Sequence, residues 1–385
     1  MRTVLNVCFF RSSCFVGLFL TFVLSLLVVS GAPHAQAKPS LYIKVLVQRN
    51  VSLKAGPARW SADGNEVTYH VQQGPKASLH RFHIFRNKHK VVSRSANGFF
   101  PSFGPAGAIV AGPLRDPKLK NLRLAKRKKR KGKKRKPAGK KKSGKAWWKV
   151  QKGQGISLFG LGQEQYLFPG IRPQYSPKAR RILFTHRNIM YLWDPLRTRK
   201  SGLLLLARGF SPTWAADGRA IAFLVKPFRF SPKKGVSGGG IALVDMLFRA
   251  SKITKSGGQV TWSADGKTLA WVDKLPSTKG SKRRNKSGFG VFWMSLKDKK
   301  RTAHLLHKQA WNPVIAPHSS PLARGLVAFQ DHRGVWVKTL SGGKSKLLVP
   351  GGTQPRWSSQ GDLLVHLPGV IKVIRLLPAL RKVLP

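Results

Sequence analysis

The sequence is poor in cysteine and in acidic residues. Its two cysteines, Cys8 and Cys14, lie near the amino terminus, so disulfides, thiolate catalysis and cysteine-metal sites are excluded from the rest of the chain. Only 12 Asp and Glu stand against 72 Lys and Arg, which gives a net charge of +60. So few carboxylates leave little room for acid–base hydrolysis, and no calcium loop, phosphate-cradling glycine-lysine motif or glycosidase-type carboxylate pair is present. We therefore expect no metal and no cofactor, and the charge indicates a polyanionic partner or surroundings.

The first 37 residues predict a secretory signal peptide. Two arginines near the start accompany a nearly continuous apolar run from Cys14 to Val29, and small residues at 35 and 37 suit a signal peptidase. An uncleaved membrane anchor is the alternative, because the apolar run approaches a marginal span. We favour cleavage, which would start the mature chain at Lys38 without an integral membrane segment. The expected localisation is periplasmic or secreted.

The rest of the chain, residues 38–385, is organised around a repeated hairpin motif. In its clearest copy Trp262 ends an extended segment, Asp265 and Gly266 form a tight turn, and an apolar strand follows. Aspartate can accept hydrogen bonds from its own turn, and glycine tolerates positive φ. The motif residues of the four full copies are Trp60, Asp63 and Gly64; Trp214, Asp217 and Gly218; Trp262, Asp265 and Gly266; and Trp357 and Gly361.

Three weaker copies, anchored at Phe103, Tyr175 and Ile315, fill the gaps between the full ones. The seven anchors are separated by 43, 72, 39, 48, 53 and 42 residues, and only the interval with a lysine-rich insert is far out of line. A period of about 40 to 45 residues with several strands is typical of propeller blades. We predict an all-β fold, a β-propeller of seven four-stranded antiparallel blades, with six blades as the alternative. The strand at 41–47 would close the ring by pairing with the last blade.

The Trp-Ser-x-Asp-Gly motif and the apolar strand after it resemble the WD-repeat-like blades of the TolB-type β-propeller family. The resemblance covers about residues 41–385 and implies the propeller fold. It also implies, as one expectation, a protein–protein interaction role in a cell-envelope complex. Two departures stand out. TolB-type proteins carry an α/β domain ahead of the propeller, and the usual proline after the serine is replaced here by Ala62, Ala216, Ala264 or Ser359.

Lysine and arginine are concentrated in three insertions. The first, 115–145, includes the stretch from Lys126 to Lys145, where 14 of 20 residues are basic and which we predict to be disordered. The others run from Lys226 to Gly240 and from Lys274 to Gly288. Each follows the strand after a hairpin motif and precedes the next strand, so all three should emerge on one face of the ring. The alternative is that solvated loops simply collect lysine.

These insertions supply the expected binding residues. The predicted polyanion-binding residues are Lys126, Arg127, Lys128, Lys129, Arg130, Lys131, Lys133, Lys134, Arg135, Lys136, Lys233, Lys234, Lys282, Arg283 and Arg284. Trp147 and Trp148 adjoin the first insertion and either stack on a sugar or base or simply begin a strand. Expected partners are an envelope phosphate polymer, an acidic polysaccharide, extracellular nucleic acid or an acidic envelope protein, bound by a monomer.

Catalytic signals are weak. Residues 235–239 match the Gly-x-Ser-x-Gly nucleophile elbow around Ser237, but the surrounding glycines and lysines predict a flexible loop. His80 and His83, and likewise His304 and His307, have metal-compatible spacing without a carboxylate cluster. We therefore expect an exported, non-enzymatic binding or scaffold protein. A TolB-like interaction component is the alternative, and a hydrolase is less favoured.

Overall fold

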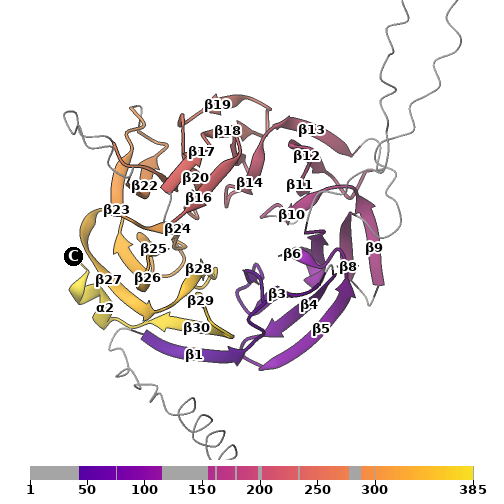
Figure 1. Cartoon of the computed structure of the whole chain (residues 1–385), viewed down its shortest axis with the longest axis horizontal. Helices are drawn as coiled ribbons and strands as arrows, with labels where there is room; N and C mark the ends of the chain where they lie inside the picture. The colour runs from indigo at the N-terminus through magenta and orange to yellow at the C-terminus, as the bar shows by residue number, and fades with distance from the viewer. Residues whose placement is uncertain are drawn as a thin grey trace, which may run out of the picture. The chain divides into compact units, whose positions relative to one another are not determined.

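The computed structural model describes residues 43–74, 76–114, 155–160, 163–177, 180–197, 202–232, 235–276, 288–298 and 300–384. These residues form seven four-stranded antiparallel sheets arranged in a ring, with the first strand of each sheet toward the centre and the last at the rim (Figure 1). This confirms the prediction of a seven-bladed β-propeller. Among the described residues no helix is long and apolar enough to cross a membrane.

Blades 1 to 4 follow one another along the chain. Their strands are β2 (Arg59–Trp60), β3 (Glu66–Gln73), β4 (Lys76–His83) and β5 (Lys88–Ser95) in blade 1; β6 (Phe99–Phe103), β7 (Ile109–Gly112), β8 (Ile156–Gly160) and β9 (Gln163–Phe168) in blade 2, with the short helix η1 (Pro105–Gly107) after β6; β10 (Ile171–Tyr175), β11 (Ile182–His186), β12 (Ile189–Trp193) and β13 (Leu203–Arg208) in blade 3; and β14 (Phe210–Trp214), β15 (Ala220–Leu224), β18 (Ile241–Asp245) and β19 (Ala250–Lys252) in blade 4.

Blades 5 to 7 complete the ring. Their strands are β20 (Gly258–Trp262), β21 (Thr268–Lys274), β22 (Phe289–Ser295) and β23 (His304–Lys308) in blade 5; β24 (Trp311–Ile315), β25 (Leu326–Gln330), β26 (Gly334–Thr339) and β27 (Gly342–Pro350) in blade 6; and β28 (Thr353–Trp357), β29 (Leu363–Leu367), β30 (Val370–Leu376) and the amino-terminal β1 (Ile43–Asn50) in blade 7, followed by the helix α2 (Ala379–Val383).

The repeated motif marks the same place in every blade. Each of the seven predicted anchors is the last residue of the first strand of a blade. The tight turns have the expected chemistry, since Gly64, Gly218, Gly266 and Gly361 have φ of 74°, 72°, 66° and 86°. The Asp265 carboxylate accepts a hydrogen bond from the backbone N–H of Lys267 at 3.1 Å. The motif therefore encodes the turn between the first and second strands.

The tryptophan anchors join neighbouring blades. The indole Nε1 of Trp60 donates to the carbonyl oxygen of Arg356 at 3.0 Å, and Trp357 donates in the same way to Val314 at 3.2 Å. Trp262 donates to Thr213 at 3.3 Å. Each acceptor lies in the first strand of the preceding blade, so a large apolar ring with one polar atom fixes each of these interfaces.

The two ends of the described chain close the ring. β1 pairs antiparallel with β30 as the rim strand of blade 7, from Ile43 opposite Leu376 to Asn50 opposite Val370. The prediction of a closing amino-terminal strand is confirmed, although the strand extends to residue 50. Pairing the two terminal strands covers sheet edges that would otherwise be open.

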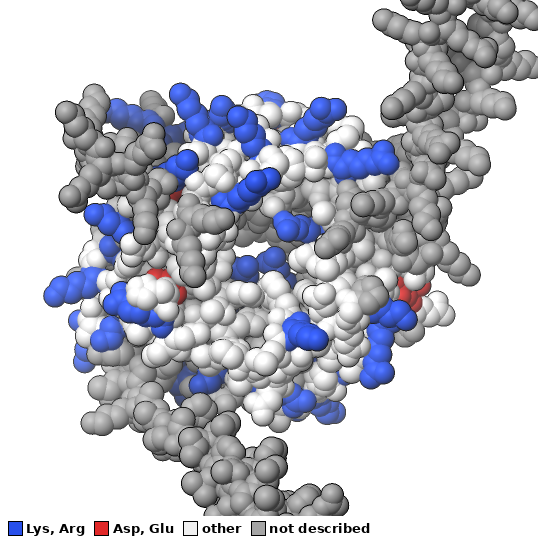
Figure 2. Space-filling model, in the orientation of Figure 1, with Lys and Arg blue, Asp and Glu red and all other residues white. Residues whose placement is uncertain are grey.

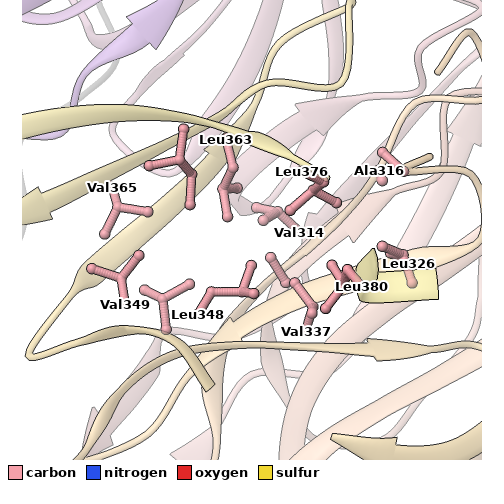
Figure 3. Packing of buried hydrophobic residues seen from close by; sticks show 14 of the residues in the cluster. Val314, Ala316, Leu326, Val337, Leu348, Val349, Leu363, Val365, Leu376 and Leu380 are labelled. Carbon is pink, nitrogen blue, oxygen red and sulfur yellow. The ribbon is translucent and has the colours of Figure 1, made fainter. Parts of the chain in front are cut away.

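Apolar residues fill the space between blades. The largest cluster lies between blades 6 and 7, where Leu363 and Val365 of β29 face Leu348 and Val349 of β27, and α2 adds Leu380 (Figure 3). Leu363 and Val365 have no exposed surface. Burial of such side chains contributes about 1.5 to 3 kcal/mol each, and it makes the ring a rigid support for residues at its centre.

The second insertion corrects an expectation. It was predicted to be a flexible loop, but it contains a β-hairpin of β16 (Phe228–Ser231) and β17 (Gly235–Gly238). Phe230 packs edge-on against Phe289, with ring centroids 5.2 Å apart, because alternate apolar residues of the hairpin turn toward blades 5 and 6. Ser237 is an exposed residue of β17 opposite Arg229, so the strand–turn–helix context of a nucleophile elbow is not formed around it.

The two faces of the ring follow from the antiparallel pairing. Phe99 pairs with Gly112, Phe210 with Leu224 and Gly258 with Val272, so the second strand ends at the edge where the first begins. We call this edge the insertion face and the opposite edge, which carries the tight turns, the turn face. The strands that flank all three basic insertions open at the insertion face, as predicted. Residues 115–154 and 277–287 themselves lie outside the described residues.

Candidate functional site: the central channel

The first strands of the seven blades line a channel at the centre of the ring. Side chains alternate along a strand, and the third residue of five first strands is a buried proline, so the second and fourth residues turn toward the channel. The second residues of β6, β10, β14, β20, β24 and β28 are Phe100, Arg172, Ser211, Gln259, Asn312 and Gln354. The residues that precede six of the anchors are Arg59, Ser102, Gln174, Thr213, Thr261 and Arg356; the seventh, Val314, packs in the apolar cluster between blades 6 and 7 instead. None of these residues is a carboxylate.

The six second residues share an unusual backbone conformation. Their φ values lie between 44° and 52°, in the left-handed region that residues with a Cβ rarely adopt. In these six blades the register of the strand pairing shifts between the first and fourth residues of the strand, a span that includes this residue. Such bulges re-aim side chains, and the rest of the blade must hold the strained residue in place. The channel therefore carries a repeated, preorganised ring of side chains near the insertion face.

Hydrogen bonds link this ring from blade to blade. Arg172 donates from Nη1 to Ser211 Oγ at 2.8 Å, and its guanidinium lies 5.4 Å from the centre of the Phe100 ring. Gln259 Oε1 accepts from the backbone N–H of Asn312 at 2.9 Å. The side chain of Gln330 joins Asn312 and Gln354 through bonds of 2.8 and 3.0 Å. Most of the ring is thus tied to a neighbouring blade.

Three arginines give the channel its charge. Arg59 and Arg356 directly precede the anchors of the adjacent blades 1 and 7, and Arg172 comes from blade 3. Among the described residues none of the three forms an ion pair with a carboxylate. The Nε atom of Arg356 is buried without a hydrogen-bond partner. Figure 2 shows blue side chains in the central hollow, while the red patches lie away from it in this view.

The arginines also influence one another. The surrounding protein, followed by the charge of Arg172, lowers the pKa of Arg59, although part of this residue stays exposed. Burial and then the charge of Arg59 lower the pKa of Arg356 to about 9. Arginine side chains stay protonated in proteins at neutral pH. The channel therefore holds repelling positive charges that lack counter-charges from the described chain.

Two buried histidines border this cluster as neutral groups. His366 Nε2 accepts a hydrogen bond from the backbone N–H of Ala58 at 3.2 Å. Burial, and then the charge of Arg356, lowers the pKa of His366 to about 4. Burial also lowers the pKa of His70 to about 4, and its ring lies 5.9 Å from that of Phe100. At neutral pH these side chains supply polar surface without further charge.

The predicted site residues fall into two groups. All eleven motif residues from Trp60 to Gly361 are described, and they lie at the end of a first strand or in the turn that follows it. Every predicted polyanion-binding residue, in 126–136, 233–234 and 282–284, lies outside the described residues, as do Trp147 and Trp148. Sequence reasoning missed the channel arginines. The available signal was that Arg59 and Arg356 occupy the same place in two copies of the motif.

The histidine pairs hold no candidate metal centre within the described ranges. His80 lies across the sheet from His89, with Nδ1 2.9 Å from Nε2, and its ring stacks on Tyr69. His304 stacks on Trp293 at 4.8 Å. No group of three potential ligand side chains comes together in the described part of the chain.

Comparisons with known proteins support the fold. No protein-family model and no characterised protein matches the sequence. Among solved structures, the chain is similar to streptogramin B lyase, with 11% identity, 89% of this chain and 100% of that chain covered, and a TM-score of 0.53. It is similar to the tricorn protease at 10% identity, 87% and 34% coverage and a TM-score of 0.53. TolB from Acinetobacter baumannii matches at 13% identity, 83% and 54% coverage and a TM-score of 0.35.

The chain is a seven-bladed β-propeller. TolB proteins occur among the matching structures, at TM-scores of 0.35 and 0.40. The chain spans about a third of the tricorn protease and about half of this TolB. At identities this low the likeness concerns the fold alone.

Proposed function

We propose that this propeller is an exported, non-enzymatic binding protein whose insertion face binds an anionic polymer or an acidic partner. The observation that carries the proposal is the common origin of the three basic insertions. The described strands on either side of each insertion open at one face, so three lysine-rich segments that lie far apart in the sequence begin and end on the same side. Lysine and arginine would displace counterions from phosphate, sulfate or carboxylate groups of the ligand.

The proposal makes affinity strongly dependent on salt. Counterion release weakens binding steeply as the salt concentration rises, whereas an interface of apolar contacts changes little. We expect the full chain to bind heparin and DNA columns tightly and to elute at high salt. The same columns distinguish the second candidate function, a protein–protein scaffold, because retention of a partner protein in concentrated salt would favour the scaffold.

The test compares equal charge changes on the two faces. The first variant replaces Lys282, Arg283 and Arg284 of the third insertion by glutamine. The matched control replaces three exposed cations of the turn face, Arg219, Lys267 and Lys297. We expect a clearly lower elution salt for the first variant and a smaller change for the control. Equal shifts in the two variants would mean that only total charge matters, and the proposed binding face would be rejected.

Removing the charge of the longest insertion should have the largest effect on binding. Replacing the 14 basic residues of 126–145 by serine and glutamine keeps the length of the segment and removes its charge. The expected result is the largest drop in elution salt of any variant, with the thermal unfolding temperature of the propeller retained. Unchanged elution would contradict the proposal.

A further inference from the structure

The inner strands of the ring carry three arginines at the central channel. Arg59, Arg172 and Arg356 lie on β2, β10 and β28, the inner strands of three different blades, and the charge of one arginine lowers the pKa of another. Like charges held together in an enclosed place destabilise a fold unless an opposite charge joins them. No described carboxylate does so. The missing counter-charge is therefore expected from a ligand.

We propose that the central channel binds a phosphate-type oxyanion between Arg59, Arg172 and Arg356. A guanidinium presents its N–H donors in a planar fork that suits phosphate and carboxylate oxygens. A planar carboxylate is satisfied by one such fork, whereas a tetrahedral phosphate accepts donors from several directions. Three guanidiniums arriving from separate blades match the second geometry better.

Part of this site is already held in place. Arg172 is fixed on one side by Ser211 and on the other by the face of Phe100, and its backbone has the left-handed conformation shared by the ring. Arg356 donates from Nη1 to the carbonyl oxygen of Pro355 at 3.2 Å, while its Nε is left without a partner. A donor that is buried and unpaired is costly, so an anion that accepts from it would stabilise the bound state. Preorganised donors also lose little freedom on binding.

This site is separate from the basic insertions. All three arginines belong to first strands of blades, whereas the insertions connect second and third strands. The proposal therefore goes beyond the binding of a polymer at the insertion face. The variant that lacks the charges of 126–145 is expected to bind phosphate in the channel as the unaltered chain does.

The test is calorimetric titration of the full chain with inorganic phosphate at constant ionic strength, with chloride as the background anion. We expect saturable binding at one site. Arg59→Gln and Arg356→Gln should each weaken it by roughly ten- to a hundredfold, the usual effect of losing hydrogen bonds to a charged group. Arg208→Gln is the control, because it removes the same charge from an exposed residue of the rim strand β13 and should leave the affinity unchanged.

Several outcomes would overturn the proposal. Absence of saturable phosphate binding to the unaltered chain would do so, as would an equal loss of affinity in Arg208→Gln, which would indicate a general charge effect. Circular dichroism shows whether each variant is folded, and Arg356→Lys, which keeps the charge but not the fork, should give an intermediate affinity. If Arg356→Gln does not fold, Arg59→Gln and Arg356→Lys carry the test.

Two further ligands define the source and shape of the anion. Tighter binding of glycerol 3-phosphate than of inorganic phosphate would support a phosphorylated ligand, and the reverse would support the free ion. Acetate binding as tightly as phosphate would contradict the choice of a tetrahedral anion. Loss of polymer binding with phosphate binding retained would refute the insertion-face proposal alone, and the opposite result would refute the channel site alone.

Discussion

On the turn face of the ring, carboxylates and cations stand side by side, whereas the central channel holds cations alone. Asp245 pairs with Arg249 at 2.7 Å, Asp362 with Arg375 at 2.8 Å, and Asp265 lies 3.4 Å from His318. Arg59, Arg172 and Arg356 have no such partner in the described chain. The scarce acidic residues are therefore not spread evenly. They lie mostly where strands turn. The arginines of the channel are among the cations that no described carboxylate neutralises.

This difference separates two uses of charge. On the turn face a charged side chain completes a local structure, such as the hydrogen bond from the Arg219 backbone to Asp217 at 2.9 Å. In the channel a charged side chain destabilises the free protein and becomes favourable only with a ligand. Substitutions in the two regions should therefore have effects of opposite sign, which the following predictions use.

Acid should lower the free energy of unfolding in two separate pH ranges. One range is set by the buried histidines beside the channel and the other by a carboxylate of the turn face. His70 and His366 have pKa values of about 4 in the folded protein and about 6.5 when unfolded, so the unfolded chain binds more protons between these values. The free energy of unfolding should fall as pH decreases from 6.5 to 4, by up to about 3 kcal/mol for each histidine. The hydrogen bond from Ser61 lowers the pKa of Asp63, so this turn loses stability only below the unfolded carboxyl pKa of about 4.

Urea unfolding at a series of pH values measures both ranges. His366→Gln keeps an acceptor for the Ala58 N–H but does not titrate, so it should remove about half of the change between pH 6.5 and 4, leaving the part due to His70 and the change at lower pH. A constant free energy of unfolding from pH 7 to 4 would contradict this account of the buried histidines.

Loss of a tryptophan anchor should lower the free energy of unfolding nearly as much as protonation of both histidines. Trp262 is 7% exposed and packs with residues of blades 4 and 5, so Trp262→Ala should lower the free energy of unfolding by about 3 to 5 kcal/mol. Trp262→Phe keeps an aromatic ring and loses the indole hydrogen bond to Thr213. Its expected cost is about 1 kcal/mol beyond the packing change. A loss below 1 kcal/mol for the alanine variant, measured by urea unfolding, would show that the anchors do not hold the blades together.

Arg375→Gln tests an arginine that has a partner. Arg375 forms two hydrogen bonds with Asp362, which is 2% exposed, and these bonds raise the pKa of Arg375. The substitution would leave a buried carboxylate without its cation. We expect the free energy of unfolding to fall by about 2 kcal/mol at pH 7. Equal stability of the variant and the unaltered protein would argue against a structural role for this pair.

Arg356→Gln tests an arginine that has no carboxylate partner among the described residues. Without an anion the same substitution should raise the free energy of unfolding by about 1 kcal/mol, because it removes a repelling charge from an enclosed place. The measurement is urea unfolding in chloride buffer without phosphate. A loss as large as that of Arg375→Gln would mean that Arg356 is engaged within the protein, and the contrast between the two regions would fail.

The repeats made most of the fold predictable. Trp60, Trp214, Trp262 and Trp357 recur with turn residues whose backbone requirements are strict, so blade number, strand order and the closing strand could all be inferred. The hairpin at Phe228–Gly238 was missed because its lysines and glycines obscured the alternation of Phe228 and Phe230. In the fold Phe230 packs against Phe289 and Trp311, which lie more than 50 residues away in the sequence, and this packing favours the strand.

The channel was not predicted for a different reason. The left-handed residues and the bulges around them do not follow from composition, since Phe100, Arg172 and Gln259 have little in common as side chains. Arg59 and Arg356 are far apart in the sequence, and only ring closure places their strands in adjacent blades. A count of basic residues directs attention to the dense run at 126–145 instead. Isolated arginines become informative once the fold shows that no described carboxylate pairs with them.

The most direct test of the central claim is a crystal structure of the full chain with tungstate, a heavy tetrahedral analogue of phosphate. We expect an anomalous peak in the channel within hydrogen-bond distance of the Arg59, Arg172 and Arg356 guanidiniums. A channel without tungstate, in crystals where the ion occupies other surface arginines, would contradict the account.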